Sequence, residues 1–388
     1  MSRARSGVVM VADIDLEYPD ARRVHVTEIA RGLVAAGCKV ELVSRGRSPG
    51  IAGVRYVQAA GSDAGKAGRI VRVNAVAVAR LVAGRHRARS LYVRYDWGVL
   101  PAILAGRALG YRVVLEVNAL TTVDVTVPGV RLGLVRGASE RVKRAAVGAA
   151  WRSAHRLLPV TERLRDRLVD DFGVPPERVE IIHNGADTEL FAPRDRAEAA
   201  RGLGLDPDDE HVLFVGLLAW WNDFPTVIDA FALVAARRPR AVLVFVGDGD
   251  ERAAIDARVQ GHGIADRVRM VGFVDDRAFV AAYVAAARVC LSPGDASLAI
   301  GRPMKLAEYL AAGRAVVGSD IPGIADMLAE TGGGRTVAPH DPAAMAQVLC
   351  ELLADPAGAD ALAAECRPII LERYSWLAIA SRIAAIFA

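Results

Sequence analysis

The chain has 388 residues and a formal net charge of +4 at pH 7, with 53% hydrophobic and 24% charged residues. This composition is typical of a globular protein of two or three domains and excludes the disordered and fibrous classes. The small charge surplus does not by itself indicate nucleic-acid binding.

Four cysteines lie far apart, without the spacing of metal ligands, which indicates buried thiols in a reducing compartment. The amino-terminal stretch has no signal-peptide pattern, and arginines interrupt every long apolar run. We therefore expect a cytoplasmic protein without a membrane-spanning helix.

Short runs rich in Val and Ile alternate with longer amphipathic segments along the whole chain, which predicts βαβ units. In the first half, strands are expected at Val8–Ala12, Val40–Ser44, Val54–Val57, Ser90–Arg94, Arg112–Val117, Arg156–Val160 and Val179–Ile182. The helices expected between them include Arg23–Ala36, Lys66–Ala83 and Arg131–Ala154. In the second half, strands are expected at Val212–Val215, Ala241–Val246, Val268–Val271, Val289–Leu291, Ala315–Gly318 and Arg335–Val337.

Continuous apolar strands flanked by amphipathic helices predict parallel sheets covered on both faces, an α/β fold. A polar segment with two prolines, between Asp187 and about Asp208, indicates a domain boundary. We expect two doubly wound, Rossmann-like domains that face one another, with the ligand in the cleft beyond the carboxyl ends of their strands.

The turn after the first expected strand has no GxGxxG glycines, so a nicotinamide-dependent dehydrogenase is disfavoured. Gly247-Asp248-Gly249-Asp250 follows a later strand, and by itself it indicates a tight strand-to-helix turn.

Several motifs occur in an ordered series. They read HNGAD at His183–Asp187, LVFVGDG at Leu243–Gly249, RVRMVGFV at Arg267–Val274, MKLAEYLAAGRAVV at Met304–Val317 and YSW at Tyr374–Trp376. The series resembles that of the family 4 glycosyltransferases, two-domain enzymes of GT-B architecture. The resemblance implies an acceptor-binding domain at 1–195, joined by a C-terminal helix at 374–388, and a nucleotide-sugar-binding domain at 196–373.

Lys305 and Glu308 lie one helical turn apart in the strongest motif. The resemblance implies that Glu308 binds the nucleotide ribose. The alternative is a structural role, in which the glutamate is favoured near the start of a helix by the helix dipole. Lys305 is a catalytic and donor-binding candidate, because its ammonium would neutralise the leaving diphosphate. An ion pair with Glu308 is its alternative. Arg302 is a second cation candidate, and Phe273 lies where the family's loop meets the base, although it can equally anchor a loop.

Asn118 ends a strand of the first domain where the family often has a histidine near the reacting sugar. Its amide can hydrogen-bond a sugar hydroxyl but carries no charge, so it is at best a substrate contact. Arg22, Arg23 and His25 follow the first strand and are acceptor-side or phosphate-side candidates. Arg23 and His25 can equally be solvated helix residues.

Two departures from the family pattern stand out. The loop Gly216–Asp223 lacks the Arg and Lys that bind the diphosphate in the family, which leaves Gly216, Leu217 and Asn222 as its donor-binding candidates. Ile300 replaces the first glutamate of the E-x7-E pair, which contacts the donor sugar in the family.

These patterns predict a retaining glycosyltransferase that moves a hexose-type sugar from a UDP- or GDP-linked donor to an acceptor hydroxyl. Neither a metal nor a separate cofactor is expected. A non-catalytic nucleotide-sugar-binding protein of the same fold, or a nucleotide-sugar epimerase, is the alternative.

The sequence indicates the acceptor less clearly than the donor. Arg131–Arg156 is a basic amphipathic stretch compatible with peripheral contact to an anionic membrane and a lipid-linked acceptor. If this stretch is an ordinary solvated helix face, a small acceptor such as an aminocyclitol is the alternative.

Overall fold

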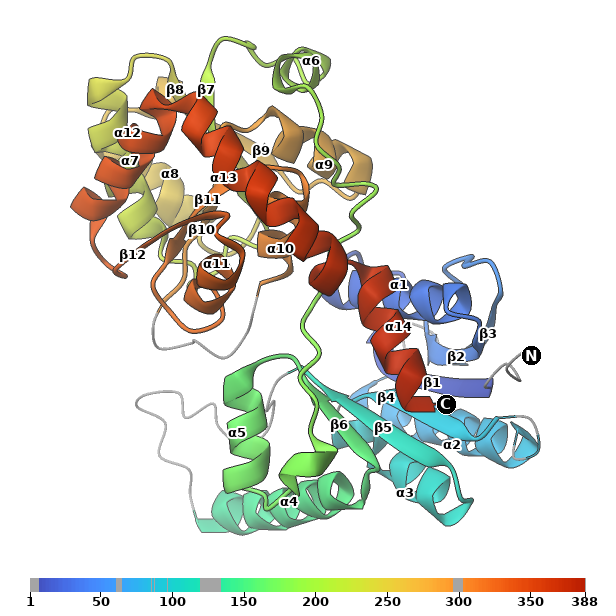
Figure 1. The fold of residues 1–388 in the computed structure, drawn as a ribbon. Helices are drawn as coiled ribbons and strands as arrows, with labels where there is room; N and C mark the ends of the chain where they lie inside the picture. Colours follow the sequence, from blue (N-terminus) through green and yellow to red (C-terminus); the bar gives the residue numbers. More distant parts are fainter. Residues whose placement is uncertain are drawn as a thin grey trace. The chain divides into compact units, whose positions relative to one another are not determined.

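The computed structural model describes residues 7–60, 65–84, 86, 88–95, 97–118, 134–295 and 303–387. The chain forms two compact units (Figure 1). The first comprises Met1–His183 together with Trp376–Ala388, and the second comprises Asn184–Ser375.

The first unit is a parallel sheet of six strands in the order β3-β2-β1-β4-β5-β6. Its strands are β1 (Gly7–Asp15), β2 (Lys39–Arg45), β3 (Val54–Ala60), β4 (Ser90–Arg94), β5 (Arg112–Val117) and β6 (Arg156–Pro159). Its helices are α1 (Ala21–Ala35), α2 (Lys66–Gly84), α3 (Leu100–Ala108), α4 (Leu134–Ser153), α5 (Glu162–Asp170) and α14 (Trp376–Phe387).

The second unit repeats this topology, in the order β12-β11-β10-β7-β8-β9. Its strands are β7 (Glu210–Val215), β8 (Ala241–Val246), β9 (Val268–Gly272), β10 (Val289–Ser292), β11 (Ala315–Ser319) and β12 (Gly334–Val337). Its helices are α6 (Arg196–Gly202), α7 (Phe224–Arg237), α8 (Arg252–Gly261), α9 (Arg277–Ala286), α10 (Met304–Ala311), α11 (Ala325–Thr331), α12 (Pro342–Ala354) and α13 (Pro356–Ile369).

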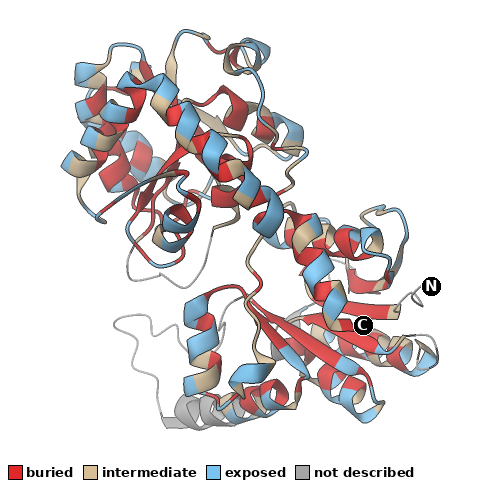
Figure 2. Ribbon diagram, viewed as in Figure 1, coloured by how far each residue is buried: buried red, intermediate tan, exposed pale blue. Residues whose placement is uncertain are grey.

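The central strands of each sheet are buried on both faces, as their continuous apolar sequences predict, whereas the edge strands β3, β9 and β12 are partly exposed (Figure 2). In the second unit, Val212 and Phe214 of β7 pack in one apolar cluster, whereas Leu213 packs in the cluster on the opposite face. This alternation follows from the two-residue period of a strand. The expectation of two doubly wound domains is therefore confirmed.

The strand expected at Val179–Ile182 is wrong. This segment runs beside β6 and makes only a single bridge, between Leu157 and Val179, although the Glu180 and Ile182 amides donate to β6 carbonyls. Pro159 has no N–H, so it cannot donate to the Glu180 carbonyl and the ladder is interrupted.

The change from the first unit to the second falls at Asn184, before the start of the boundary segment expected between Asp187 and about Asp208. Ala186 and Phe191 are buried in an apolar cluster of the second unit. The Ala186 amide also donates to the Tyr374 carbonyl at 2.8 Å. The HNGAD motif therefore spans the change from one unit to the other, and the whole polar segment belongs to the second.

The last helix, α14, packs on α1 of the first unit. The ring of Trp376 meets the His25 ring edge-on, with centroids 5.0 Å apart. A Cβ on Gly32 would lie 2.5 Å from the Cβ of Ala380, so the two helices approach closely where Gly32 has no side chain.

Candidate functional site

The strand order of the second unit reverses between β10 and β7, because chain connections leave these neighbouring strands in opposite directions. In open parallel sheets such a switch point creates a crevice beyond the carboxyl ends of the strands, where ligands bind. The loops that follow β7 and β10 are therefore the candidate ligand-binding loops of this unit.

The loops after β7 and β8 contact each other through their backbones. The amide of Leu218 donates to the Asp248 carbonyl at 2.9 Å, and the Glu251 amide donates to the Leu218 carbonyl at 3.0 Å. Gly247 has a φ of 143°, and a Cβ there would lie 1.9 Å from the Gly216 carbonyl oxygen. Only glycine fits this contact, so the GDG motif holds the β7 loop in place.

Helix α10 crosses the switch point and carries the strongest motif. The buried Tyr309 hydroxyl accepts a hydrogen bond from the Val215 amide at 2.8 Å, which fixes the helix against the end of β7. Pro303 precedes the helix in an extended conformation, as is common directly before a helix starts.

Lys305 is held in the first turn of α10 beside β7. Its Nζ lies 3.8 Å from the centroid of the Phe214 ring and 3.4 Å from Oδ1 of Asn222. A Cβ on Gly216 would lie 3.6 Å from the same Nζ. The structure thus brings together Lys305, Asn222 and Gly216, three of the candidates from the sequence.

Burial lowers the pKa of Lys305 from 10.5 to about 7. The face of the Phe214 ring favours the charged form, but no carboxylate is recorded within ion-pair distance of Nζ among the described residues. The neutral amine is therefore poised to gain a proton when an anion approaches it.

Glu308 is buried, and its Oε1 accepts a hydrogen bond from Arg277 Nη2 at 2.9 Å. The Arg277 guanidinium also lies 5.3 Å from the centroid of the Phe191 ring. The charge-assisted hydrogen bond from Arg277 fixes the carboxylate.

Arg277 is not among the residues that the sequence motifs indicate. It begins α9, after the β9 loop, and one arginine among many gives no signal in a single sequence. The contact is visible only when α9 and α10 are both in place.

Asn222 and Asp223 close the β7 loop and are buried. The Asn222 amide nitrogen donates to the Leu217 carbonyl at 3.0 Å. Asp223 caps α7 through the Thr226 amide, and it accepts from the His340 amide at 3.0 Å. Trp221 connects to the loop after β10, since its carbonyl accepts from the Asp295 amide at 2.9 Å.

Four large apolar side chains are exposed along these loops: Leu217, Trp220, Trp221 and Phe273. The Trp220 and Trp221 rings are perpendicular neighbours, with centroids 6.0 Å apart. Phe273 directly follows Gly272, whose φ of 87° turns the chain at the end of β9. Phe273 is therefore not the buried loop anchor that the sequence left open.

Arg302 and Ile300 lie outside the described residues. Within the described part of the chain, no group of three or more His, Cys, Asp and Glu side chains is arranged to hold a metal ion. Among the same residues, no helix is long and apolar enough to cross a membrane.

In the first unit, a buried polar cluster lies at the carboxyl end of β5. His25 Nε2 lies 2.6 Å from Glu116 Oε1, and both side chains are buried. The Tyr92 hydroxyl and the Asn118 amide also donate to the Glu116 carboxylate. The structure thus brings together His25 and Asn118 through a glutamate that the sequence analysis did not single out.

Burial raises the pKa of the Glu116 carboxyl, but its contacts with His25, Arg94 and Tyr92 outweigh burial and lower the pKa to about 2. Glu116 is therefore ionised, and it orients His25 and Asn118. His25 is a buried partner of this carboxylate, so the expectation of a solvated helix residue is wrong for it.

Arg22 and Arg23 lie in the first turn of α1. Asp20 caps the helix by accepting from both of their amides, and Arg22 Nε donates to Asp20 Oδ2 at 2.6 Å. Arg22 is exposed and Arg23 is half-buried. The structure does not bring either one to the Glu116 cluster.

Comparison with known proteins agrees with this geometry. The family model described as "Glycosyltransferase Family 4" matches residues 23–190, and the one described as "Glycosyl transferases group 1" matches residues 209–355. D-inositol 3-phosphate glycosyltransferase 1 of Catenulispora acidiphila is 29% identical over 366 residues, which cover 88% of this chain and 84% of that protein.

Two solved structures share the fold. Sucrose-phosphate synthase from Thermosynechococcus elongatus has a TM-score of 0.74 and 21% identity, with 99% of this chain and 98% of that chain covered. Anabaena HepE in complex with UDP-glucose has a TM-score of 0.72 and 16% identity, with 98% of each chain covered. The GT-B fold expected from the sequence is thereby confirmed. The chain belongs to the family 4 glycosyltransferases and is an enzyme that transfers a sugar.

Proposed function

We propose that this enzyme transfers a hexose-type sugar, with retention and without a metal, from a uridine diphosphate donor to a hydroxyl of a small cyclitol acceptor. The observation that carries the proposal is the position of Lys305. A buried lysine with a lowered pKa stands at the switch point of the second sheet, beside a glycine backbone and one turn from a buried glutamate.

Lys305 is proposed to bind the diphosphate. The β7 loop lacks the family's Arg and Lys, so Lys305 is the cation that the described part of this edge offers next to Gly216. Phe214 and Asn222 hold the ammonium in place but do not neutralise it. An incoming diphosphate would supply that missing negative charge.

Glu308 is proposed to accept the hydroxyls of the nucleotide ribose. Its carboxylate is fixed by Arg277, so the side chain does not have to be ordered when the nucleotide binds. The exposed Phe273 and the Trp220–Trp221 pair provide apolar faces at the same edge, suited to a planar base or to the apolar face of a sugar ring.

In the proposed reaction, the bond between the anomeric carbon and the diphosphate oxygen breaks. A bond from the acceptor oxygen to that carbon forms on the same face. The acceptor's hydroxyl proton passes to the departing diphosphate oxygen. Lys305 stabilises the negative charge that develops on this leaving group, and the protein supplies no nucleophile.

The comparisons support the choice of substrates. HepE binds UDP-glucose, and the Catenulispora relative is named for an inositol phosphate, a cyclitol.

Two basic residues of the amphipathic stretch Arg131–Arg156 have partners inside the first unit. Arg152 Nη1 donates to the Phe172 carbonyl at 2.7 Å, and Arg144 lies 4.7 Å from the centroid of the Phe172 ring. These contacts favour a small acceptor over a membrane surface.

Turnover tests the proposal. The purified chain is incubated with UDP- and GDP-linked hexoses, with and without inositol, inositol phosphates and aminocyclitols, and release of the nucleoside diphosphate is measured. We expect acceptor-dependent release of UDP and an α-linked product from an α-linked donor. Tight nucleotide binding without turnover across the panel would instead support the non-catalytic alternative.

Co-sedimentation with vesicles tests the acceptor class. We expect no binding to phosphatidylglycerol-containing vesicles at 0.15 M salt, about the physiological ionic strength. Binding that survives high salt would instead favour a lipid-linked acceptor.

A further inference from the structure

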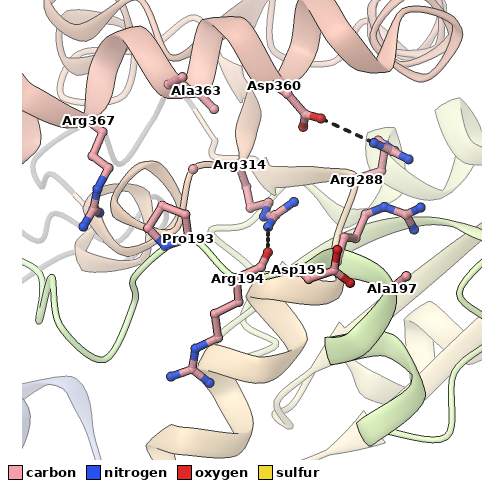
Figure 3. Close-up of a pocket in the computed structure, with 12 residues that line it drawn as sticks. Pro193, Arg194, Asp195, Ala197, Arg288, Arg314, Asp360, Ala363 and Arg367 are labelled. Carbon is pink, nitrogen blue, oxygen red and sulfur yellow. Dashed lines mark hydrogen bonds and ion pairs between the residues drawn. The ribbon is translucent and has the colours of Figure 1, made fainter.

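A cavity of about 560 Å³ is lined by residues of the second unit (Figure 3). Two of its lining residues, Arg288 and Arg314, directly precede β10 and β11 and so mark the amino ends of these strands. Lys305 and Asn222 lie at the carboxyl edge. The cavity is therefore separate from the proposed donor site.

Five arginines and two aspartates line this cavity. They are Arg194, Arg196, Arg288, Arg314, Arg367, Asp195 and Asp360. The one recorded ion pair among these residues is long, with 3.8 Å between Arg288 Nη1 and Asp360 Oδ2. The Asp360 side chain is 58% exposed whereas that of Arg288 is 16% exposed, so water weakens this pair on the acidic side.

Arg314 is the most buried of these arginines, with 7% of its surface exposed. Its Nη2 donates to the Arg194 carbonyl at 2.8 Å, but its buried Nε has no hydrogen-bond partner. An unsatisfied buried donor is destabilising, so it marks a position where an acceptor is missing.

The neighbouring arginines also give this cavity positive charge that the nearby carboxylates do not fully balance. Burial lowers the pKa of Arg196, and the positive charges of Arg288 and Arg314 lower it further. Burial likewise lowers the pKa of Arg314, which Asp360 and Asp195 raise and Arg288 lowers. Both guanidinium groups remain charged near neutral pH. Three arginines therefore repel one another at a site that two solvated carboxylates compensate only in part.

The close-up shows how the labelled side chains lie. Arg288 and Arg314 extend toward the space between Asp195 and Asp360, whereas Arg194 extends away from it (Figure 3). The basic cluster that faces the cavity is thus formed by Arg288, Arg314 and the nearby Arg196.

We propose that this cavity binds the phosphoryl group of a small phosphorylated ligand, at a site distinct from the donor site. Guanidinium groups match the oxygens of a phosphate by paired hydrogen bonds, and a dianion would balance the excess charge. A phosphate oxygen would also supply the acceptor that Arg314 Nε lacks. The volume lies within the range of small-molecule sites, which leaves room for an organic group beside the phosphate.

Calorimetric titration with inorganic pyrophosphate at constant ionic strength tests the proposal. All variants carry Lys305→Met, so that anion binding at the donor site does not contribute and failure of the proposed function leaves this result unaffected. We expect binding in this background, weakened by about tenfold or more when Arg314→Met or Arg288→Gln is added.

The matched control is Arg335→Gln, which removes an exposed arginine of the same unit and should leave affinity unchanged. If Arg314→Met does not fold, Arg288→Gln decides the test by itself. A titration with ribose 5-phosphate and with ribose then shows whether the phosphoryl group is required, and we expect binding of the phosphate ester only. Absence of pyrophosphate binding, or binding that neither cavity variant weakens, would overturn the proposal.

Discussion

Lys305 has the property on which the proposed chemistry most depends, because its charge changes near neutral pH. Burial lowers its pKa to about 7, so the free enzyme loses the proton as the pH rises above that value. A bound diphosphate favours the protonated form and raises the pKa again. Nucleotide affinity is therefore linked to the pH.

We expect UDP affinity to fall between pH 7 and 9, by at most about tenfold per pH unit for one linked proton. UDP itself keeps a nearly constant charge over this range, as the last phosphate pKa is about 6. In Lys305→Arg the guanidinium stays charged, and the affinity should be nearly independent of pH. Calorimetric titration measures the UDP affinity of both proteins between pH 7 and 9. Equal slopes of affinity against pH would contradict the assignment of Lys305.

Glu308 is the second residue to test. We expect Glu308→Ala to weaken UDP binding by about 2 kcal/mol or more, because charge-assisted hydrogen bonds to the ribose are lost. Arg277→Met should weaken binding less, since the carboxylate remains but is no longer held by the hydrogen bond at 2.9 Å. Unchanged affinity in Glu308→Ala would exclude its proposed role, and a larger loss in Arg277→Met would indicate that Arg277 itself contacts the nucleotide.

At the scale of elements, the loops after β7 and β8 depend on glycine. Gly247→Ala forces a Cβ to within 1.9 Å of the Gly216 carbonyl oxygen at a φ of 143°. We expect it to lower the free energy of unfolding of the second unit by about 3 kcal/mol and to weaken UDP binding, because Gly216 lies beside Lys305.

Gly261→Ala is the matched control for this change. A Cβ at Gly261, the last residue of α8, would meet no atom within 4 Å. It should be neutral or stabilise by about 0.5–1 kcal/mol. Denaturant unfolding compares the two variants, and similar effects from both would contradict the steric explanation.

The elements also show how far the sequence predicts the fold. Apolar runs and helical periodicity predict nearly all the strands because burial on both faces imposes a continuous pattern. The segment Val179–Ile182 has that pattern without forming a strand, since the obstacle is a missing N–H on Pro159 in a neighbouring strand. Such a failure depends on register, which local sequence does not contain.

Some residues of the candidate site can be predicted from the sequence, and others become visible only in the structure. Lys305, Glu308 and the glycines could be selected because they occur within short motifs that resemble a family pattern. Arg277 and Glu116 could not, because each acquires its role from a partner far away in the sequence. The buried state of His25 likewise follows from α14, which supplies Trp376 from the other end of the chain.

At the scale of the whole molecule, the last helix is predicted to stabilise the first unit although the preceding residues belong to the second. Ile383 in α14 is fully buried, so Ile383→Ala should destabilise the first unit by about 2–4 kcal/mol through the cavity that it leaves. Leu377 in the same helix is 57% exposed, and Leu377→Ala should change stability by no more than about 0.5 kcal/mol. Hydrogen exchange resolved by segment distinguishes the units, and loss of protection confined to the second unit would contradict this assignment.

The central claim is that the carboxyl edge of the second sheet binds the nucleotide of the sugar donor. A crystal structure of the enzyme with UDP tests it most directly. The account predicts that a Glu308 carboxylate oxygen lies within hydrogen-bond distance of the ribose hydroxyls, that is, about 2.5–3.0 Å, and that Lys305 Nζ contacts the diphosphate. A nucleotide bound elsewhere, with Glu308 and Lys305 still making only the contacts described above, would contradict it.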